Sequence, residues 1–191
     1  MRSAASSALV AGWHHGLAIV NLRGPGDNLA FVSGARRALG LGLPLEPCTT
    51  VADDGLRVVW AGPDDWFVVG PAGQAGAIAG RLRAEIADTH HAVTDVSSGY
   101  TVLCVAGPPA RDVLAQGCPL DLHRRVFTPG MAAGSHYFKA SIWLWQVDEA
   151  PAFELLVRRS FMAYCWLMLD RGTAECGMVA RHRDANVGAT R

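Results

Sequence analysis

Apolar positions along the chain follow two periods, one of two residues and one of helical spacing. Residues 17–23 (LAIVNLR) form an apolar run with β-branched members that ends at Gly-Pro-Gly, and this pattern predicts a strand. Asp27 and Asn28 then offer a helix N-cap, because apolar residues recur at helical spacing over 29–40. The rest of this half predicts two strands and an amphipathic helix, at 56–62, 65–70 and 75–87.

The second half of the chain repeats this order of elements. It predicts a strand, a short helix, two paired strands and a second helix, at 100–107, 109–117, 140–148, 153–159 and 161–170. The register is also kept, since Pro25 and Pro108 are 83 residues apart and Leu82 and Trp166 are 84 apart. An offset this constant indicates an internal duplication.

The predicted fold class is therefore α+β, with two duplicated β-α-β-β-α (ferredoxin-like) repeats packed together and helices on one face of each sheet. Neither repeat has enough core to be comfortably stable alone. The expected divisions are an N-terminal extension, a first repeat, a second repeat and a flexible C-terminal tail, at 1–16, 17–90, 91–171 and 172–191.

The strand within 141–147 is apolar on both faces, because side chains alternate between faces along a strand. One face carries Trp143, Trp145 and Val147. The opposite face is expected to pack on the helices, so the tryptophan face must be covered by the sister repeat or by a partner. We expect these three residues at or next to a subunit interface.

Composition adds a second indication of a protein partner. Lys and Arg number 17, Asp and Glu also number 17, and charged residues make up only 18% of the chain. A neutral chain without a basic block has no field to attract a phosphate backbone, so nucleic acid is not an expected partner. Hydrophobic residues reach 50% of the chain, so either the core is unusually large or part of the surface meets another protein, and we favour the second interpretation.

The cellular setting is predicted from the same composition. The N-terminus lacks the apolar core of a secretory signal, and the apolar run at 161–169 is too short to span a membrane. Five cysteines at scattered spacing, with no Cys-x-x-Cys, favour neither a disulfide framework nor a zinc site. The expected setting is the reducing cytoplasm.

Cys118, Asp121 and His123 lie close together in the sequence and could suggest a catalytic or metal site. Pro119 forces Cys118 into extended backbone, so Asp121 and His123 share one face and the thiol lies on the other. A thiolate nucleophile needs a base within hydrogen-bond reach, which this geometry does not supply. The first half keeps the Pro-Leu-acid pattern at 44–46 without any histidine, so we interpret the cluster as structural.

Three other features have structural interpretations. The Gly-Pro turns at 24–26 and 107–109 contain proline, which removes an amide donor, and they lack a nucleotide-binding glycine pattern. Adjacent histidines at 14–15 and 90–91 point in opposing directions, so we expect surface or boundary positions. The segment 95–99 resembles a turn held by its Asp and Ser side chains. No catalytic, cofactor-binding or metal-ligating residue is predicted on this chain.

A longer series of motifs resembles a known family. The series is VNLRG at 20–24, ALGLGLPLEP at 38–47, GPDDWFVVG at 62–70, DVSSGYTVLCVAGPPARDVLAQGCPLDL at 95–122 and FELLVRRSF at 153–161. It is similar to the gamma subunits of heterotetrameric sarcosine oxidases and covers roughly residues 17–170.

The resemblance implies a fold similar to the folate-binding aminomethyltransferase of the glycine-cleavage system. It also implies a cytoplasmic complex with alpha, beta and delta subunits that oxidatively demethylates sarcosine to glycine and passes the one-carbon unit to tetrahydrofolate. FAD, FMN, NAD, tetrahydrofolate and zinc are expected on those other subunits, and this chain is expected to be a non-catalytic subunit that stabilises or positions them.

Two alternatives stay open. The chain could be a stand-alone folate-binding protein or an aminomethyltransferase-like module, for which Asp95, Arg57 and Arg158 are the available charged groups. It could also be the gamma subunit of a related N-methyl amine oxidoreductase.

Overall fold

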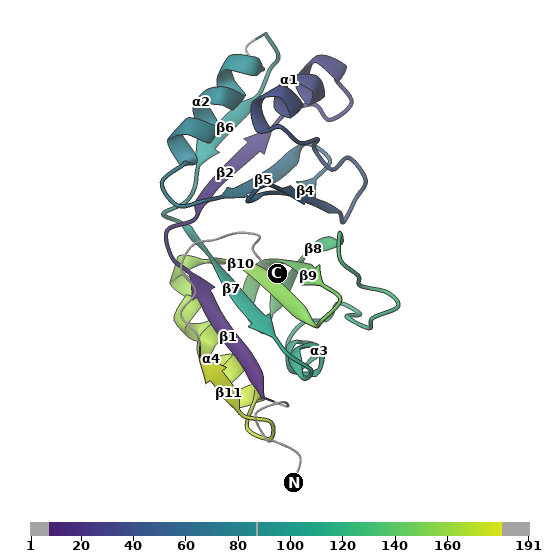
Figure 1. Cartoon of the computed structure of the whole chain (residues 1–191), viewed down its shortest axis with the longest axis vertical. Helices are drawn as coiled ribbons and strands as arrows, with labels where there is room; N and C mark the ends of the chain where they lie inside the picture. Colours follow the sequence, from purple (N-terminus) through teal and green to yellow (C-terminus); the bar gives the residue numbers. More distant parts are fainter. Residues whose placement is uncertain (1–7, 87, 181–191) are drawn as a thin grey trace. The chain divides into compact units, whose positions relative to one another are not determined.

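The computed structural model describes residues 8–86 and 88–180, which form two compact units (Figure 1). Residues 15–100 make up one of them, called here the α1–α2 unit. The other, the α3–α4 unit, combines residues 8–14 with residues 101–180.

An antiparallel sheet forms one layer of the α1–α2 unit. Within the described residues its strands run in the order β3-β4-β5-β2-β6. Their bounds are β2 Ala18–Arg23, β3 Thr50–Asp53, β4 Leu56–Gly62, β5 Asp65–Gly70 and β6 Ala92–Asp95. The central pair β2–β5 keeps one register throughout, from Ala18 opposite Gly70 to Arg23 opposite Asp65.

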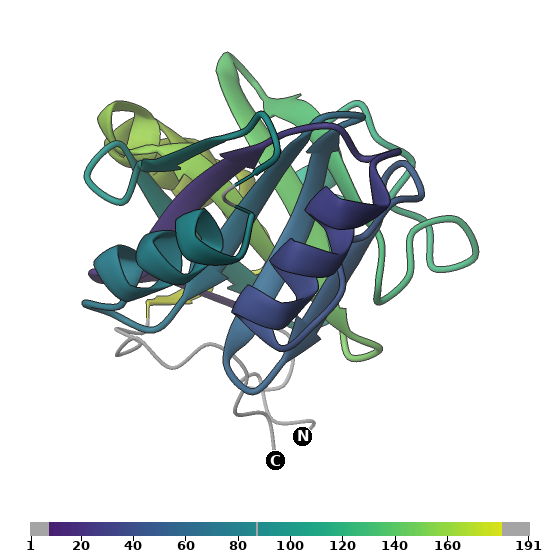
Figure 2. The ribbon, with the colours of Figure 1, turned by 90° about the horizontal axis from the view of Figure 1, so that it is seen from above.

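The second layer of this unit is a pair of helices, α1 (Leu29–Leu39) and α2 (Ala75–Glu85), which lie side by side (Figure 2). Between sheet and helices lies an apolar core that includes Val20, Leu22, Phe31, Ala35, Trp66, Val68, Ile78 and Leu82. The largest of these side chains, Trp66, is fully buried, and its indole N–H donates to the carbonyl of Pro44 at 2.8 Å. Burial of the polar tip of the tryptophan is thereby compensated.

Local sequence explains both ends of α1. Asn28 caps the helix, because its side-chain oxygen accepts hydrogen bonds from the first free amides. Gly40 ends it with a φ of 78°, a left-handed conformation that glycine adopts without a steric cost. Midway along the helix, Gly34 allows a close approach to α2: a Cβ there would lie 2.5 Å from the backbone oxygen of Glu85.

The α3–α4 unit has a mixed sheet with the strand order β11-β1-β7-β10-β9-β8 among the described residues. Its strands are β1 Leu9–His14, β7 Tyr100–Ala106, β8 Ala132–Tyr137, β9 Ala140–Asp148, β10 Ala152–Arg158 and β11 Met178–Ala180. The N-terminal strand β1 pairs antiparallel with β7 and parallel with β11. Three segments far apart in sequence therefore meet at this edge of the sheet.

One face of this sheet packs on α3 (Ala110–Ala115) and α4 (Met162–Gly172). The core there includes Leu103, Val105, Val113, Leu114, Ile142, Leu144, Phe153, Leu155, Cys165 and Leu169. Arg111 of α3 ties the loop before β8 to the sheet: its guanidinium donates to the carbonyls of Leu122 and Phe127 and to Gln146 Oε1. It also lies 5.1 Å from the centre of the Phe153 ring.

The predicted α+β class is confirmed, and so are all the strands and helices predicted from apolar periodicity, with ends shifted by a few residues. Five short strands were missed: β1, β3, β6, β8 and β11. Residues 9–14, expected in an N-terminal extension, form β1, and 178–180, expected in the tail, form β11. The tail residues 181–191 lie outside the described residues.

Candidate functional site

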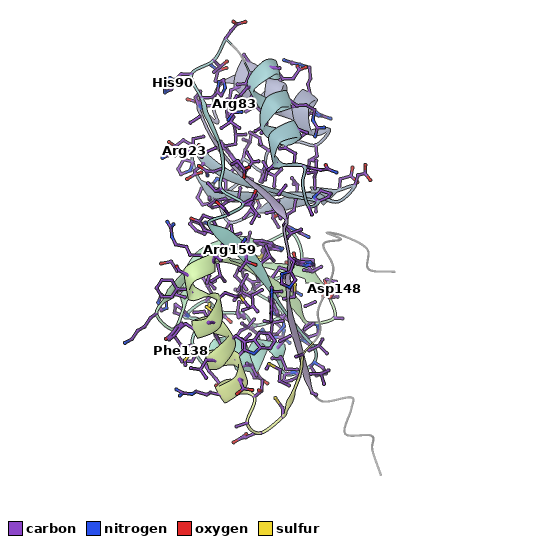
Figure 3. The ribbon with its side chains drawn as sticks, turned by 90° about the vertical axis from the view of Figure 1, so that its left-hand side faces the viewer. Arg23, Arg83, His90, Phe138, Asp148 and Arg159 are labelled. Carbon is purple, nitrogen blue, oxygen red and sulfur yellow. The ribbon has the colours of Figure 1, made fainter. Side chains whose placement is uncertain are left out.

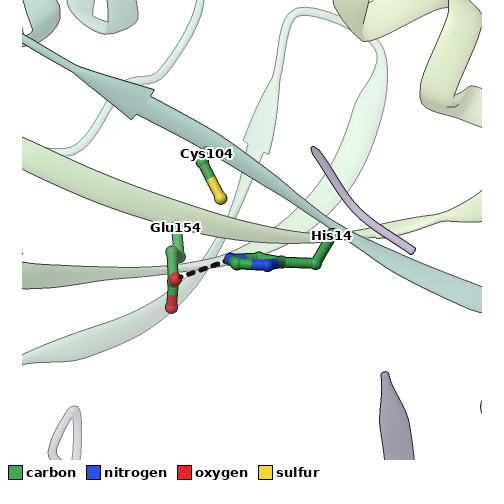
Figure 4. Close-up of side chains that lie close together, drawn as sticks. All are labelled: His14, Cys104 and Glu154. Carbon is green, nitrogen blue, oxygen red and sulfur yellow. Dashed lines mark hydrogen bonds and ion pairs between the residues drawn. The ribbon is translucent and has the colours of Figure 1, made fainter. Parts of the chain in front are cut away.

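Three neighbouring strands of the α3–α4 unit bring a histidine, a cysteine and a glutamate together (Figure 4). On the paired strands β1 and β7, Gly12 lies opposite Cys104, so His14 is two residues further along the same face as Cys104. Glu154 comes from the next strand, β10. One potential ligand atom from each of the three side chains lies within 4.8 Å of the other two.

Hydrogen bonds hold this cluster in place. His14 Nε2 lies 3.2 Å from Glu154 Oε1, and Glu154 Oε2 accepts the indole N–H of Trp145 at 2.7 Å. Trp145 stands directly opposite Glu154 in the β9–β10 pair. His14 Nδ1 is buried and has no hydrogen-bond partner within residues 8–86 and 88–180. Both carboxylate oxygens are therefore engaged, whereas one imidazole nitrogen is not.

The cluster is shielded from water. His14 is 3% exposed and Cys104 8%, while the side chain of Glu154 is 12% exposed. The geometry does not favour covalent catalysis, because His14 Nε2 faces the carboxylate and the thiol has little surface for a substrate to approach. A thiol, an imidazole and a carboxylate together are nonetheless the ligand types of a zinc site.

This cluster was not predicted from the sequence, and the surface or boundary position predicted for His14 is wrong. His14 was expected at a surface or boundary, but β1 buries it, whereas its neighbour His15 is exposed. The three residues come from segments 90 and 50 residues apart, so no spacing motif could indicate them. Only the strand order β1-β7-β10 brings them together.

Cys118, Asp121 and His123 do not converge. Cys118 is buried and its thiol donates weakly to Ser135 at 3.7 Å. Asp121 accepts the backbone N–H of His123, whose Nδ1 in turn lies 3.3 Å from the amide of Arg125. These are local turn contacts, as expected for a structural segment.

The two glycine turns use their amides within the fold. Gly24 N–H donates to the carbonyl of Asp64 at 3.1 Å, and Gly107 N–H to that of Pro151 at 2.9 Å. An open hollow beside the first turn is lined by Arg23, Asp64, His90 and His91, and Figure 3 labels Arg23 and His90 on this side of the unit. Arg23 pairs with Asp64 at 3.2 Å, which reduces its availability to an anion.

The predicted turn at 95–99 is confirmed. Asp95 Oδ1 accepts hydrogen bonds from both the backbone N–H and the hydroxyl of Ser97. The Ser97 hydroxyl oxygen accepts the amide of Ile19 at 2.9 Å and so ties the turn to β2. These two Ser97 hydrogen bonds, the side-chain one first, lower the pKa of Asp95 below its ordinary value.

The three tryptophan-face residues differ in exposure. Trp145 has no exposed surface and bonds Glu154, whereas Trp143 and Val147 are half-buried. Ile142 and Leu144, on the opposite face of the strand, lie in the core with residues of α3 and α4. Of the three expected interface residues, therefore, only Trp143 and Val147 keep surface that another protein could contact.

Comparisons with known proteins agree with the motif series. The family described as "Sarcosine oxidase, gamma subunit family" matches residues 23–175. Sarcosine oxidase subunit gamma from Corynebacterium sp. (strain P-1) is 33% identical over 134 residues, which is 69% of this chain and 64% of that protein. The Arthrobacter subunit gamma is 35% identical over 119 residues, 62% of this chain and 58% of its own. The aligned part thus spans less than two thirds of these relatives.

Solved structures show the same likeness. A chain of the heterotetrameric sarcosine oxidase from Corynebacterium sp. U-96 superposes with a TM-score of 0.84 at 25% identity, covering 91% of this chain and 88% of that one. The glycine cleavage system aminomethyltransferase T from Bartonella henselae shares the fold, with a TM-score of 0.64 at 15% identity over 93% of this chain and 48% of its own. The chain belongs to the sarcosine oxidase gamma subunit family.

Proposed function

We propose that this chain is a non-catalytic gamma subunit that stabilises or positions the larger subunits of a heterotetrameric sarcosine oxidase. In this proposal the alpha, beta and delta subunits carry FAD, FMN, NAD, tetrahydrofolate and zinc, and demethylate sarcosine oxidatively. Family membership and the likeness to a chain of a heterotetrameric sarcosine oxidase support the assignment.

The observation that carries the docking role is the outer surface of α4. Of its eleven residues, only Cys165 and Leu169 are buried. Leu167 is 44% exposed, and Phe161, just before the helix, is 39% exposed. Tyr164, Trp166 and Met168 are half-buried. We call Phe161, Tyr164, Leu167 and Met168 the α4 patch; the helix carrying it faces the viewer in Figure 3.

This patch suits another subunit of the complex better than water. Leu167 and Phe161 are exposed, whereas Tyr164 and Met168 also pack against the core of the unit and keep only part of their surface. Exposed apolar side chains that lie together mark a protein contact, and aromatic residues and methionine are enriched at such contacts. Exposed Arg159 and Arg171 lie near the two ends of the helix. The partner surface is therefore expected to be an apolar groove with carboxylates at its rim.

A matched pair of variants tests the proposal. Leu167→Glu should abolish or weaken co-purification with the other three subunits by about tenfold or more, because a buried unpaired charge at an interface is costly. Leu29→Glu is the control, since Leu29 is 79% exposed at the start of α1 and should tolerate the same change. Both variants should fold, as judged by circular dichroism. Normal assembly of Leu167→Glu would overturn docking through α4, and a wild-type chain that joins no complex would overturn the function itself.

We also propose that the two units descend from one duplicated β-α-β-β-α repeat, with 17–90 and 91–171 as the two copies. The sheet orders support this, since β3-β4-β5-β2 corresponds to β8-β9-β10-β7. Next to β2 lies β6, which follows α2, but next to β7 lies β1 from the start of the chain. The two copies along the sequence would then not coincide with the two compact units. β6 lies within the second copy but in the sheet of the α1–α2 unit, and β1 lies before both copies but in the sheet of the α3–α4 unit.

The cytoplasm remains our proposed compartment. All five cysteines lie in the described residues and are free thiols there, as expected in a reducing environment. No helix in the described part of the chain is long and apolar enough to span a bilayer.

A further inference from the structure

We propose that His14, Cys104 and Glu154 bind a zinc-class divalent cation, Zn²⁺ with Co²⁺ as its spectroscopic substitute. This inference does not rest on the docking role, because the three ligands lie on strands β1, β7 and β10 and none of them belongs to the α4 patch. The fourth position would be held by water, as is usual where a zinc ion has three protein ligands.

The separation of the ligand atoms supports a tetrahedral site. Zinc–nitrogen and zinc–oxygen bonds are about 2.1 Å, so the edge joining two such ligands in a tetrahedron is about 3.4 Å. The observed distance from His14 Nε2 to Glu154 Oε1 is 3.2 Å. The Cys104 sulfur lies on the side of the cluster where these two groups meet (Figure 4), and the ligand atoms are all within 4.8 Å.

Charge also favours a cation of this class. A thiolate and a carboxylate carry two negative charges, which a divalent ion neutralises; an unpaired charge in so buried a place would be unfavourable. The soft sulfur and the imidazole nitrogen disfavour Mg²⁺ and Ca²⁺, which take oxygen ligands.

The contact that holds Glu154 resembles the outer contacts of known metal sites. The indole of Trp145 holds Glu154 Oε2 at 2.7 Å and leaves Oε1 directed at His14, and such outer contacts orient a ligating carboxylate. The other nitrogen of the ligating ring, His14 Nδ1, is buried and has no hydrogen-bond partner in the described residues. The described residues therefore orient the carboxylate of the site but not the imidazole.

The bound ion would cross-link the sheet edge. His14 and Cys104 are 90 residues apart, and β1 is the strand that completes the unit from the start of the chain. A metal that binds the folded state alone stabilises it by mass action. We therefore expect Zn²⁺ to raise the Tm of the wild-type chain and to leave the Tm of a Cys104→Ser variant unchanged.

Cobalt titration of the tag-free, reduced full chain is the principal test. Wild type should bind one equivalent of Co²⁺ and show a thiolate-to-cobalt charge-transfer band that Zn²⁺ removes. Cys104→Ser should lose the band, and Glu154→Gln should weaken binding by about 100-fold or more, since changes one shell further out already cost about 10–100-fold. Cys118→Ser is the matched control, because Cys118 is a buried cysteine of the same unit outside the cluster, and it should bind as wild type does.

Two results would overturn the site: no thiolate band in wild type, or a band that survives Cys104→Ser. If Cys104→Ser does not fold, X-ray absorption of the zinc-loaded wild type decides. One sulfur at about 2.3 Å with three nitrogen or oxygen ligands at about 2.0–2.2 Å supports the site. A shell without sulfur, or with more than one, contradicts it.

Discussion

The α1–α2 and α3–α4 units place helices on a sheet in the same way but present different outer surfaces. On α1 and α2 the exposed positions include the charged residues Arg36, Arg37, Arg81, Arg83 and Glu85. On α4 the corresponding surface carries Phe161 and Leu167, with Tyr164 and Met168 half-buried. The surface of α1 and α2 thus mixes charged residues with the exposed Leu29, whereas the α4 patch is apolar and suited to a partner.

The units also differ in what their sheets hold. Polar side chains of the α1–α2 sheet form local turns and edge pairs, such as Asp95 with Ser97 and Arg23 with Asp64. The α3–α4 sheet instead buries His14, Cys104 and Glu154 across three strands. Both the apolar surface and the buried polar cluster therefore occur in the same unit. The difference suggests that one unit is mainly a scaffold and that the other carries the interactions.

The largest expected effect concerns the core of the scaffold unit. Trp66→Ala should lower the free energy of unfolding by about 3–5 kcal/mol, because it removes a fully buried ring and leaves the Pro44 carbonyl without its donor. Trp60→Ala, at a half-buried position, should cost clearly less. Urea denaturation measures both, and equal losses would contradict the assignment of Trp66 as the core anchor.

The α3–α4 unit depends on a polar anchor instead. Arg111→Lys should cost about 2–3 kcal/mol, since lysine cannot make the forked contacts to two carbonyls and Gln146. Exposed Arg125→Lys should have little effect. Hydrogen exchange should show the loss first in the loop between α3 and β8. Protection unchanged in that loop would show that Arg111 does not hold it.

Two glycine-to-alanine substitutions in the helices of the α1–α2 unit should have opposite effects on stability. Gly34→Ala should destabilise by about 1–3 kcal/mol, because its Cβ would lie 2.5 Å from a backbone oxygen of α2. Gly80→Ala should stabilise by up to about 1 kcal/mol, since nothing lies within 4 Å and alanine favours helix. Thermal melts of the two variants check the contrast, and a stabilised Gly34→Ala would disprove the close packing.

The smallest expected effect is the pH dependence of the Asp95 turn. The folded state lowers the pKa of Asp95, so its contribution to stability is present above the ordinary carboxyl pKa of about 4 and is lost as the pH falls through the lower folded value. Asp95→Asn should cost less than about 1 kcal/mol at pH 7, because the site is exposed. The difference from wild type should shrink below about pH 4 in denaturation curves. A difference that stays constant would show that the charge is not involved.

Local patterns in the sequence predicted the long elements. The cap at Asn28 and the apolar spacing that follows it were sufficient for α1, and β-branched runs were sufficient for β2 and β5. Short strands such as β3 and β8 were missed because a segment of four residues, or a run containing glycine and serine, has no clear hydrophobic period.

Long-range pairing explains the misses at the candidate site. His14 was expected at a surface or boundary position because it is adjacent to His15. Its burial instead depends on the pairing of β1 with β7, nearly ninety residues later in the chain. Trp145 was placed on the correct face of its strand, yet its partner Glu154 became evident only from the β9–β10 register. Cross-strand neighbours of this kind are set by topology, which a single sequence does not specify.

Oxidative footprinting of the chain, free and within the proposed sarcosine oxidase complex, tests docking through the α4 patch. Hydroxyl radicals label exposed aromatic, aliphatic and sulfur side chains, so the readout reports the α4 patch and the exposed Leu29 in one experiment. We expect Phe161, Tyr164, Leu167 and Met168 to lose most of their labelling on assembly, while Leu29 keeps its own. Unchanged labelling of the α4 patch, with protection of α1 and α2 instead, would contradict it.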